Sequence, residues 1–200
     1  MPRFIQRLYP ERVWAFSRKE KTVYLTFDDG PIPEITPWVL SELKKHNTKA
    51  TFFCVGENVQ KNPEVFQKII SEGHSVGNHT FNHLSGWKTD TLQYVTNVSK
   101  CEETFNSKLF RPPYGKITSK QAKILQQKGL KIVMWDVISY DYDAIITEEK
   151  CLQNVLKNIK SGSIIVFHDI LKAEKNLRYV LPKVLKFISD KGWECSSIQH

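Results

Sequence analysis

The sequence has no long hydrophobic run, and no stretch approaches the roughly 18 consecutive apolar residues of a membrane-spanning helix. Residues 1–21 are interrupted by Pro2, Pro10 and several charges, so they lack the apolar centre of a secretory signal peptide. We therefore expect a cytoplasmic protein without a transmembrane segment. We expect residues 1–21 to be an N-terminal extension and residues 22–200 to form one domain.

Cysteine is scarce, and the four cysteines, at positions 54, 101, 151 and 195, form no CxxC pair. This spacing predicts reduced and mostly buried thiols.

Acidic residues are outnumbered, with 21 Asp and Glu against 29 Lys and Arg, which gives a net charge of +8. The basic residues form no block and accompany no nucleic-acid motif, so we expect no nucleic-acid partner. We also predict no obligate protein partner. A basic surface is compatible with an acidic glycan or an anionic membrane surface.

Short runs of apolar and β-branched residues recur along the chain. Some, such as Ile-Ile-Val-Phe at 164–167, are apolar throughout, which is typical of strands buried on both faces. The expected strands are Val23–Phe27, Ala50–Val55, His74–Gly77, Leu109–Arg111, Lys131–Asp136, Ser163–Phe167 and Trp193–Ile198.

Helical patterns separate these strands. The expected helices are Thr36–His46, Pro63–Glu72, Thr89–Phe105, Ser119–Lys128, Glu148–Lys160 and Glu174–Lys191. Repeated strand–helix units predict a parallel sheet with helices outside it. We predict an α/β fold, a distorted and irregular (β/α) barrel with about seven parallel strands, and keep an open doubly wound sheet as the alternative.

In such a barrel the reactive side chains lie at the carboxyl ends of the strands. Asp28 and Asp29 leave the first expected strand, and His79 and His83 follow the third. Two histidines at positions i and i+4 lie on one side of a helical turn, so both can reach one metal ion. Each motif alone also has a simpler interpretation, a capped turn for the aspartates and coincidental spacing for the histidines.

Later strands end in further polar residues. Arg111 is followed by two prolines, which stiffen the backbone, and a fixed guanidinium can hold a carboxylate. Asp141 follows the fifth expected strand, and His168 ends the sixth. Taken alone, a histidine at the end of an apolar strand is typical of a core histidine with a hydrogen-bond partner. Because these residues gather at the same ends of successive strands, the sequence predicts an active site.

The motifs TFDDGP, HTFNH, RPPYG, DYD and VFHD, in this order, resemble the five motifs of the polysaccharide deacetylases. These proteins share NodB homology and form carbohydrate esterase family 4. The resemblance covers about residues 22 to 198, and it implies that the domain is a metal-dependent deacetylase on a distorted (β/α) barrel. The implied substrate is an acetylated glycan or oligosaccharide, such as chitooligosaccharide or peptidoglycan.

The resemblance also implies the site residues. Asp29, His79 and His83 would hold a divalent metal, Zn²⁺ by preference and Co²⁺ or Ni²⁺ as alternatives. Asp28 would be the general base, oriented by Arg111, and His168 the general acid, held by Asp141. Four residues would contact the substrate: Tyr114, Pro113, Tyr142 and Val166. Tyr114 would offer its backbone N–H to the oxyanion, and Tyr142 and Val166 would line the pocket for the acetyl methyl.

The sequence departs from the family pattern at two positions of the fourth motif, where Ile138 replaces a common Asp and Tyr142 a common Trp. Val166 replaces a common Leu in the fifth motif. These departures concern the acyl pocket and the sugar specificity rather than the catalytic set.

Three other functions fit parts of the pattern. The same site would hydrolyse a small amide, imide or ureide. Two histidines and a carboxylate also describe the facial triad of Fe(II) oxygenases. Finally, the scaffold would serve as a glycan-binding module without catalysis, although all five expected catalytic and metal-binding residues are present.

Overall fold

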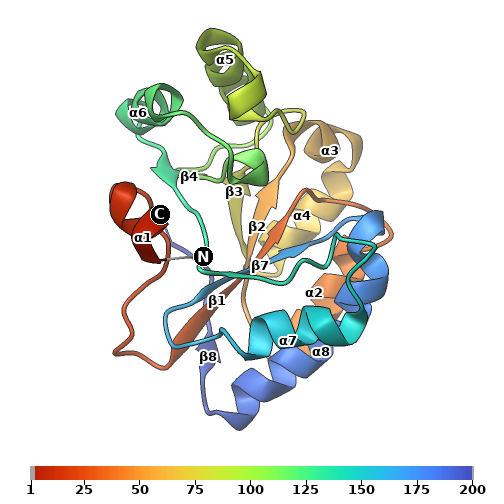
Figure 1. The fold of residues 1–200 in the computed structure, drawn as a ribbon. Helices are drawn as coiled ribbons and strands as arrows, with labels where there is room; N and C mark the ends of the chain where they lie inside the picture. Colours follow the sequence, from red (N-terminus) through yellow and green to blue (C-terminus); the bar gives the residue numbers. More distant parts are fainter. Residues whose placement is uncertain (1–2, 200) are drawn as a thin grey trace.

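The computed structural model describes residues 3–199. A parallel sheet curls into an incompletely closed barrel (Figure 1). Its strands are β1 (Thr22–Asp28), β2 (Thr51–Cys54), β3 (Ser75–Asn78), β4 (Leu109–Phe110), β5 (Lys131–Ile132), β6 (Val137–Ile138), β7 (Ile164–His168) and β8 (Glu194–Cys195). The strand order is β5-β4-β3-β2-β1-β7-β6, and β8 pairs with the start of β1. The predicted distorted (β/α) barrel is confirmed.

Helices connect the strands and cover the outside of the sheet. They are α1 (Arg3–Leu8), α2 (Thr36–Lys45), α3 (Gly56–Lys61), α4 (Pro63–Ser71), α5 (Thr91–Glu102), α6 (Ser119–Gln127), α7 (Glu148–Leu156) and α8 (Glu174–Asp190), with short 3₁₀ turns η1 (Gly86–Lys88), η2 (Pro113–Gly115) and η3 (Leu171–Ala173). In Figure 1, α2, α7 and α8 lie together on one side of the sheet. The short α3 is absent from the sequence-based prediction.

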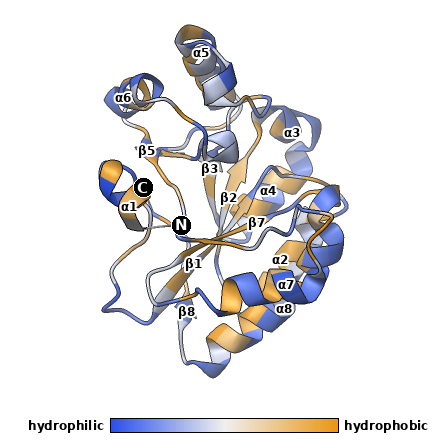
Figure 2. Ribbon diagram, in the orientation of Figure 1, coloured by the Kyte–Doolittle hydropathy of each residue, from blue (hydrophilic) through white to orange (hydrophobic). Residues whose placement is uncertain are grey.

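The side-chain alternation of β1 separates the core from the functional end of the barrel. Leu25 and Phe27 pack outward with Leu40 and Leu43 of α2 in the main hydrophobic cluster. Asp28, one residue along, therefore faces the interior of the barrel. Figure 2 shows orange, hydrophobic strands at the centre and outer helices striped in orange and blue.

The predicted strand Lys131–Asp136 is wrong beyond its first two residues, because β5 ends at Ile132 and the next strand, β6, begins at Val137 at the opposite end of the strand order. The chain crosses the barrel between them. The N-terminal segment spans the same gap: Val13 bridges to Val133, and Ala15 bridges to Ser163. Trp14 between them is buried. Residues 13–15 therefore complete the barrel wall, which the sequence pattern did not indicate.

Within residues 3–199, no helix combines the length and apolar character needed to cross a membrane. All four cysteines are unpaired thiols, and three of them are buried, as predicted.

Candidate metal centre and active site

Asp29, His79 and His83 converge at the carboxyl ends of β1 and β3. The Nε2 atoms of His79 and His83 lie 3.3 and 3.0 Å from Asp29 Oδ1. One ligand atom from each of the three residues lies within 4.8 Å of the others. His79 is buried, and the other two side chains are partly exposed. The structure thus brings together the three predicted metal ligands.

The polarity of these groups fits a bound cation. The Nδ1 of His79 lies 2.7 Å from the backbone carbonyl of Arg111, so Nδ1 carries the proton and donates it to that oxygen. Nε2 is then a lone pair that faces Asp29. Asp29 Oδ1 is buried and has no hydrogen-bond donor. Lone pairs that converge in this way require a positive charge between them, and two imidazoles with a carboxylate are a typical zinc set.

Asp29 remains ionised in this setting. Burial alone would raise the pKa of its carboxyl, but the contacts with His79 and His83 hold that pKa well below the ordinary value. Its backbone has φ 82°, in the left-handed region, and its carbonyl accepts a hydrogen bond of 2.8 Å from Asn58 Nδ2. The loop conformation thus turns the carboxylate toward the histidines.

The expectation that both histidines lie on a helical turn is wrong. His79 follows β3 directly, and the segment to His83 is a non-helical loop in which Thr80 and His83 have φ 64° and 60°. Asn78 Oδ1 accepts from the Thr80 N–H at 2.8 Å, and Asn97 Oδ1 accepts from the Phe81 N–H at 2.9 Å. These side-chain hydrogen bonds, rather than helical ones, bring the histidines together.

Arg111 forms a salt bridge with Asp28. The Arg111 Nη1 lies 2.7 Å from Asp28 Oδ1 and donates at the same distance to Thr26 Oγ1. Its Nε and Nη2 donate to the carbonyls of Val133 and Met134 at 3.2 and 2.9 Å. Arg111 is fully buried, and the side chain is fixed by four hydrogen bonds. This is the predicted contact between Arg111 and Asp28, and its charge-assisted hydrogen bond fixes the orientation of the carboxylate.

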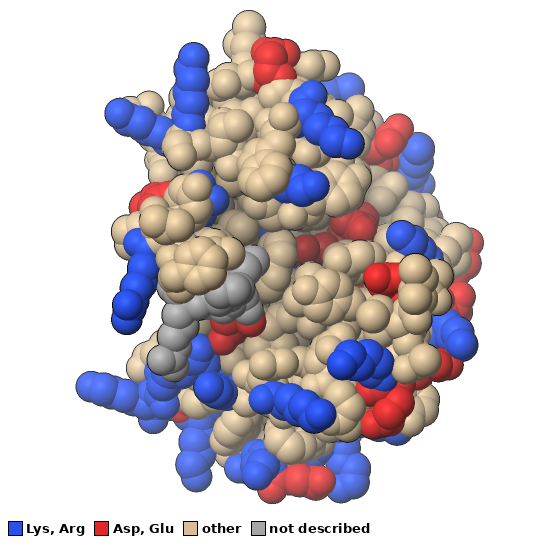
Figure 3. Space-filling model, viewed as in Figure 1, with Lys and Arg blue, Asp and Glu red and all other residues tan. Residues whose placement is uncertain are grey.

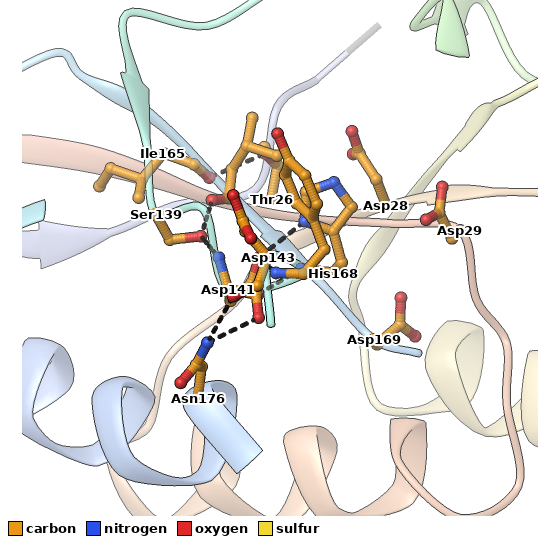
Figure 4. Close-up of polar contacts among 12 residues, drawn as sticks. Thr26, Asp28, Asp29, Ser139, Asp141, Asp143, Ile165, His168, Asp169 and Asn176 are labelled. Carbon is orange, nitrogen blue, oxygen red and sulfur yellow. Dashed lines mark hydrogen bonds and ion pairs between the residues drawn. The ribbon is translucent and has the colours of Figure 1, made fainter. Parts of the chain in front are cut away.

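His168 lies at the end of β7 and contacts Asp141 twice. Its Nδ1 is 2.8 Å from Asp141 Oδ1, and its backbone N–H donates to Oδ2 at 2.8 Å. Burial would lower the pKa of His168, but the Asp141 charge and hydrogen bond raise it to about 9. Figure 4 shows His168 between Asp141 on one side and Asp28 and Asp29 on the other. The imidazole is therefore a protonated acid at neutral pH.

Two residues outside the motifs support Asp141. Asn176 of α8 donates from Nδ2 to the Asp141 carbonyl at 3.0 Å, and Ser139 Oγ accepts from the Asp141 N–H at 3.2 Å (Figure 4). Asn176 is distant in sequence, and the helical pattern around it gives no signal of this role.

A second carboxylate, Asp169, holds the turn after β1. Asp169 is fully buried and accepts from the Gly30 N–H at 3.1 Å and from Thr36 Oγ1 at 2.5 Å. A Cβ added to Gly30 would lie 2.0 Å from Asp169 Oδ2, so the carboxylate fills the space that glycine leaves. The sequence gives no signal of this link, because Gly30 and Asp169 lie 139 positions apart.

A cavity of about 540 Å³ is lined by the candidate metal ligands and by Asp28 and His168. Tyr114, Tyr142 and Val166 line it as predicted, together with Ile138. Pro113 is buried and is not among the lining residues, so its role in substrate binding stays a prediction, as does the oxyanion contact of the Tyr114 N–H. Figure 3 shows acidic atoms recessed near the centre of this face and basic side chains around its margin.

The sequence pattern missed several residues that line the cavity: Lys116, Trp135, Ile170 and Lys172. Lys116, Ile170 and Lys172 each follow a recognised motif within three residues, which was the available signal for them. Trp135 lies inside an expected strand, and no signal in the sequence indicated that it would line the cavity.

Comparison with known proteins agrees with this geometry. The family model described as polysaccharide deacetylase matches residues 16–133. A peptidoglycan-N-acetylglucosamine deacetylase of Bacillus cereus is 41% identical over 78% of this chain and 59% of its own length. The chain thus spans less than two thirds of that relative. A second protein of the same description and species is 33% identical over 94% of this chain and 91% of its own.

Solved structures agree as well. The structure of a peptidoglycan N-acetylglucosamine deacetylase in complex with a hydroxamate-type benzamide superposes with a TM-score of 0.91. It is 33% identical and covers 99% of this chain and 95% of its own. The resemblance therefore extends over sequence and fold together.

Proposed function

The chain belongs to the polysaccharide deacetylase family, and from this premise we propose that it removes N-acetyl groups from a glycan by metal-dependent hydrolysis. One observation carries the proposal. A candidate metal triad, an arginine-held carboxylate and a protonated histidine line a single cavity.

Asp29, His79 and His83 are the residues that would hold the ion, with zinc as the first candidate and cobalt or nickel as the others. When bound, a divalent ion lowers the pKa of a coordinated water and stabilises negative charge on the acetyl oxygen. The protein supplies the orientation, because the Arg111 carbonyl fixes the His79 ring and Asn58 fixes the Asp29 backbone.

Asp28 is suited to act as the general base. Arg111 engages its Oδ1, so Oδ2 is the oxygen that would accept a proton from the attacking water. The buried guanidinium prevents the carboxylate from rotating. Arg111 is in this sense a positioning residue.

His168 is suited to act as the general acid. Its Nδ1–H is directed to Asp141, which leaves Nε2–H to protonate the leaving nitrogen as the C–N bond breaks. Acid and base are thus two separate groups, each oriented by its own partner.

The substrate class is supported by the cavity and by the relatives. A cavity of about 540 Å³ is larger than an acetamide and accommodates a sugar residue around it. The relatives described above are named peptidoglycan-N-acetylglucosamine deacetylases. We therefore assign N-acetylglucosamine within a glycan as the acetylated residue.

Acetate release from β-1,4-linked N-acetylglucosamine tetramers tests this function. Zinc-reconstituted protein is expected to release acetate, while chelator-treated protein is expected to be inactive until zinc is restored. His79→Ala should neither retain zinc nor release acetate. Equal acetate release with and without chelator would refute metal dependence, and no release by the zinc-loaded protein would refute the substrate class.

A further inference from the structure

A second cavity adjoins the catalytic one. It has a volume of about 570 Å³ and lies between the N-terminal segment and the loop after β4. Tyr114, Lys116 and Trp135 line both cavities, so the two adjoin at these residues. The proposed substrate is a polymer, and the sugar next to the one being deacetylated must leave the catalytic cavity by some route. The second cavity offers that route with a volume typical of ligand pockets.

Trp87 forms an exposed, fixed wall of this second cavity. Trp87 is 66% exposed, which is an unusually large exposed fraction for a tryptophan. The indole Nε1–H donates to the Ile117 carbonyl at 3.3 Å, which restrains the ring although it faces solvent. A restrained aromatic face suits the apolar C–H face of a pyranose ring, because the negative π-face attracts the positively polarised hydrogens.

Lys116 lies where the two cavities meet. It is half-buried, and its Nζ is 5.6 Å from the centre of the Trp87 ring. No ion pair with Lys116 occurs among residues 3–199, whereas the nearby Arg12 pairs with Glu11 and stacks on Tyr9. Of the two carboxylates of the catalytic cavity, Asp28 pairs with Arg111 and Asp29 belongs to the candidate metal set, and neither forms an ion pair with Lys116. Lys116 is thus a cation without a carboxylate at the exit of the site.

We propose that Trp87 and Lys116 form a second saccharide subsite that binds a carboxylate-bearing sugar adjacent to the N-acetylglucosamine residue being deacetylated. The sugar ring stacks on Trp87, and its carboxylate pairs with Lys116. This inference rests on the proposed function and adds the charge and position of the neighbouring sugar. A carboxylate-bearing substrate agrees with the net charge of +8, because a basic protein favours the association of anionic polymers.

Three tetrasaccharides of equal length separate the two roles. One is neutral, the N-acetylglucosamine tetramer. The second alternates N-acetylglucosamine with N-acetylmuramic acid, and the third is that acidic tetramer with its carboxylates converted to amides. The wild-type protein is expected to deacetylate the acidic tetramer with a kcat/KM about 10-fold above that of its amide, at low ionic strength where screening is weak.

Substitutions should dissociate the two contributions. Lys116→Met, which keeps the length of the stem, should reduce the acid-to-amide ratio of kcat/KM to about 1, and kcat/KM for the neutral tetramer measures any effect of the substitution on the cavity itself. Trp87→Ala should lower kcat/KM for all three tetramers by about 10-fold while retaining the acid-to-amide preference. Lys183→Ala is the matched control, because Lys183 also lies over an aromatic ring, that of Tyr179, but outside both cavities.

The outcomes distinguish this inference from the proposed function. Equal kcat/KM of the wild-type protein on the acidic tetramer and its amide, with acetate released from both, would overturn the inference alone. An unchanged ratio in Lys116→Met would do the same. If no tetramer releases acetate, the proposed function fails, and calorimetric binding then decides the subsite: tighter binding of the acidic tetramer by the wild-type protein than by Lys116→Met supports it, and equal binding overturns it.

Discussion

Two charged pairs give the residues of the cavity their separate roles. Arg111 keeps Asp28 as an oriented carboxylate, and Asp141 keeps His168 as an imidazolium. Both pairs join side chains from different strands, so neither is visible as a spacing in the sequence. The motif positions nevertheless indicated that these four residues lie near one another, because each lies at or just beyond a strand end, where a parallel barrel collects its side chains.

Replacing Asp141 by Asn should change the pH dependence of deacetylation. The His168 pKa of about 9 keeps the acid protonated through neutral pH, and the alkaline limb of kcat/KM is expected near that value. Without the Asp141 charge, burial lowers the His168 pKa, so the alkaline limb should move to lower pH by roughly 1–3 units. Turnover at pH 8 should fall accordingly.

The matched control is Asp143→Asn in the same loop, since the Asp143 carboxylate accepts from the Ile145 N–H rather than from His168. Its pH profile should resemble that of the wild-type protein. An unchanged alkaline limb in Asp141→Asn would show that His168 does not set it.

At the scale of elements, the loops that follow the strands determine the positions of the site residues. The turn after β1 and the loop after β3 depend on partners far along the chain, such as Asp169 for Gly30, which lie 139 positions apart. Asp29 and His83, which belong to these loops, have positive φ angles of 82° and 60°. The sequence therefore predicted which residues gather, but it predicted a helical turn at the histidines where the structure has a loop.

Asp169 and Gly30 should be energetically coupled. Asp169→Ala leaves the buried Gly30 N–H without an acceptor, and we expect it to lower the free energy of unfolding by about 1–3 kcal/mol. Gly30→Ala should destabilise the wild-type protein, because the added Cβ would lie 2.0 Å from the Asp169 carboxylate. In the Asp169→Ala background that overlap is absent, so the double variant should be more stable than the sum of the two changes predicts.

Urea unfolding of the four zinc-free proteins measures this coupling. Additive changes would contradict the packing between Gly30 and Asp169. A surface change such as Lys183→Ala provides the reference for an uncoupled site.

For the molecule as a whole, the N-terminal segment and the break between β5 and β6 decide how the barrel is completed. Val13 bridges to Val133 just after β5, Ala15 bridges to Ser163 just before β7, and Trp14 is buried in the second hydrophobic cluster. The apolar residues at 132–135 favoured one long strand, whereas β5 ends at Ile132 and Val133 bridges to Val13, more than 100 positions earlier. The same N-terminal segment lines the second cavity beside the catalytic one. One part of the chain therefore closes the barrel wall and also forms part of the proposed saccharide subsite.

The central claim is that metal binding and proton abstraction belong to separate carboxylates, Asp29 and Asp28. The most direct measurement is zinc content and acetate release, determined together for the wild-type protein and for Asp28→Asn. We predict that the variant holds zinc as the wild-type protein does and loses turnover by about 10²- to 10⁴-fold, the usual contribution of a general base. Substantial turnover by the zinc-loaded variant, or loss of its zinc, would contradict the assignment.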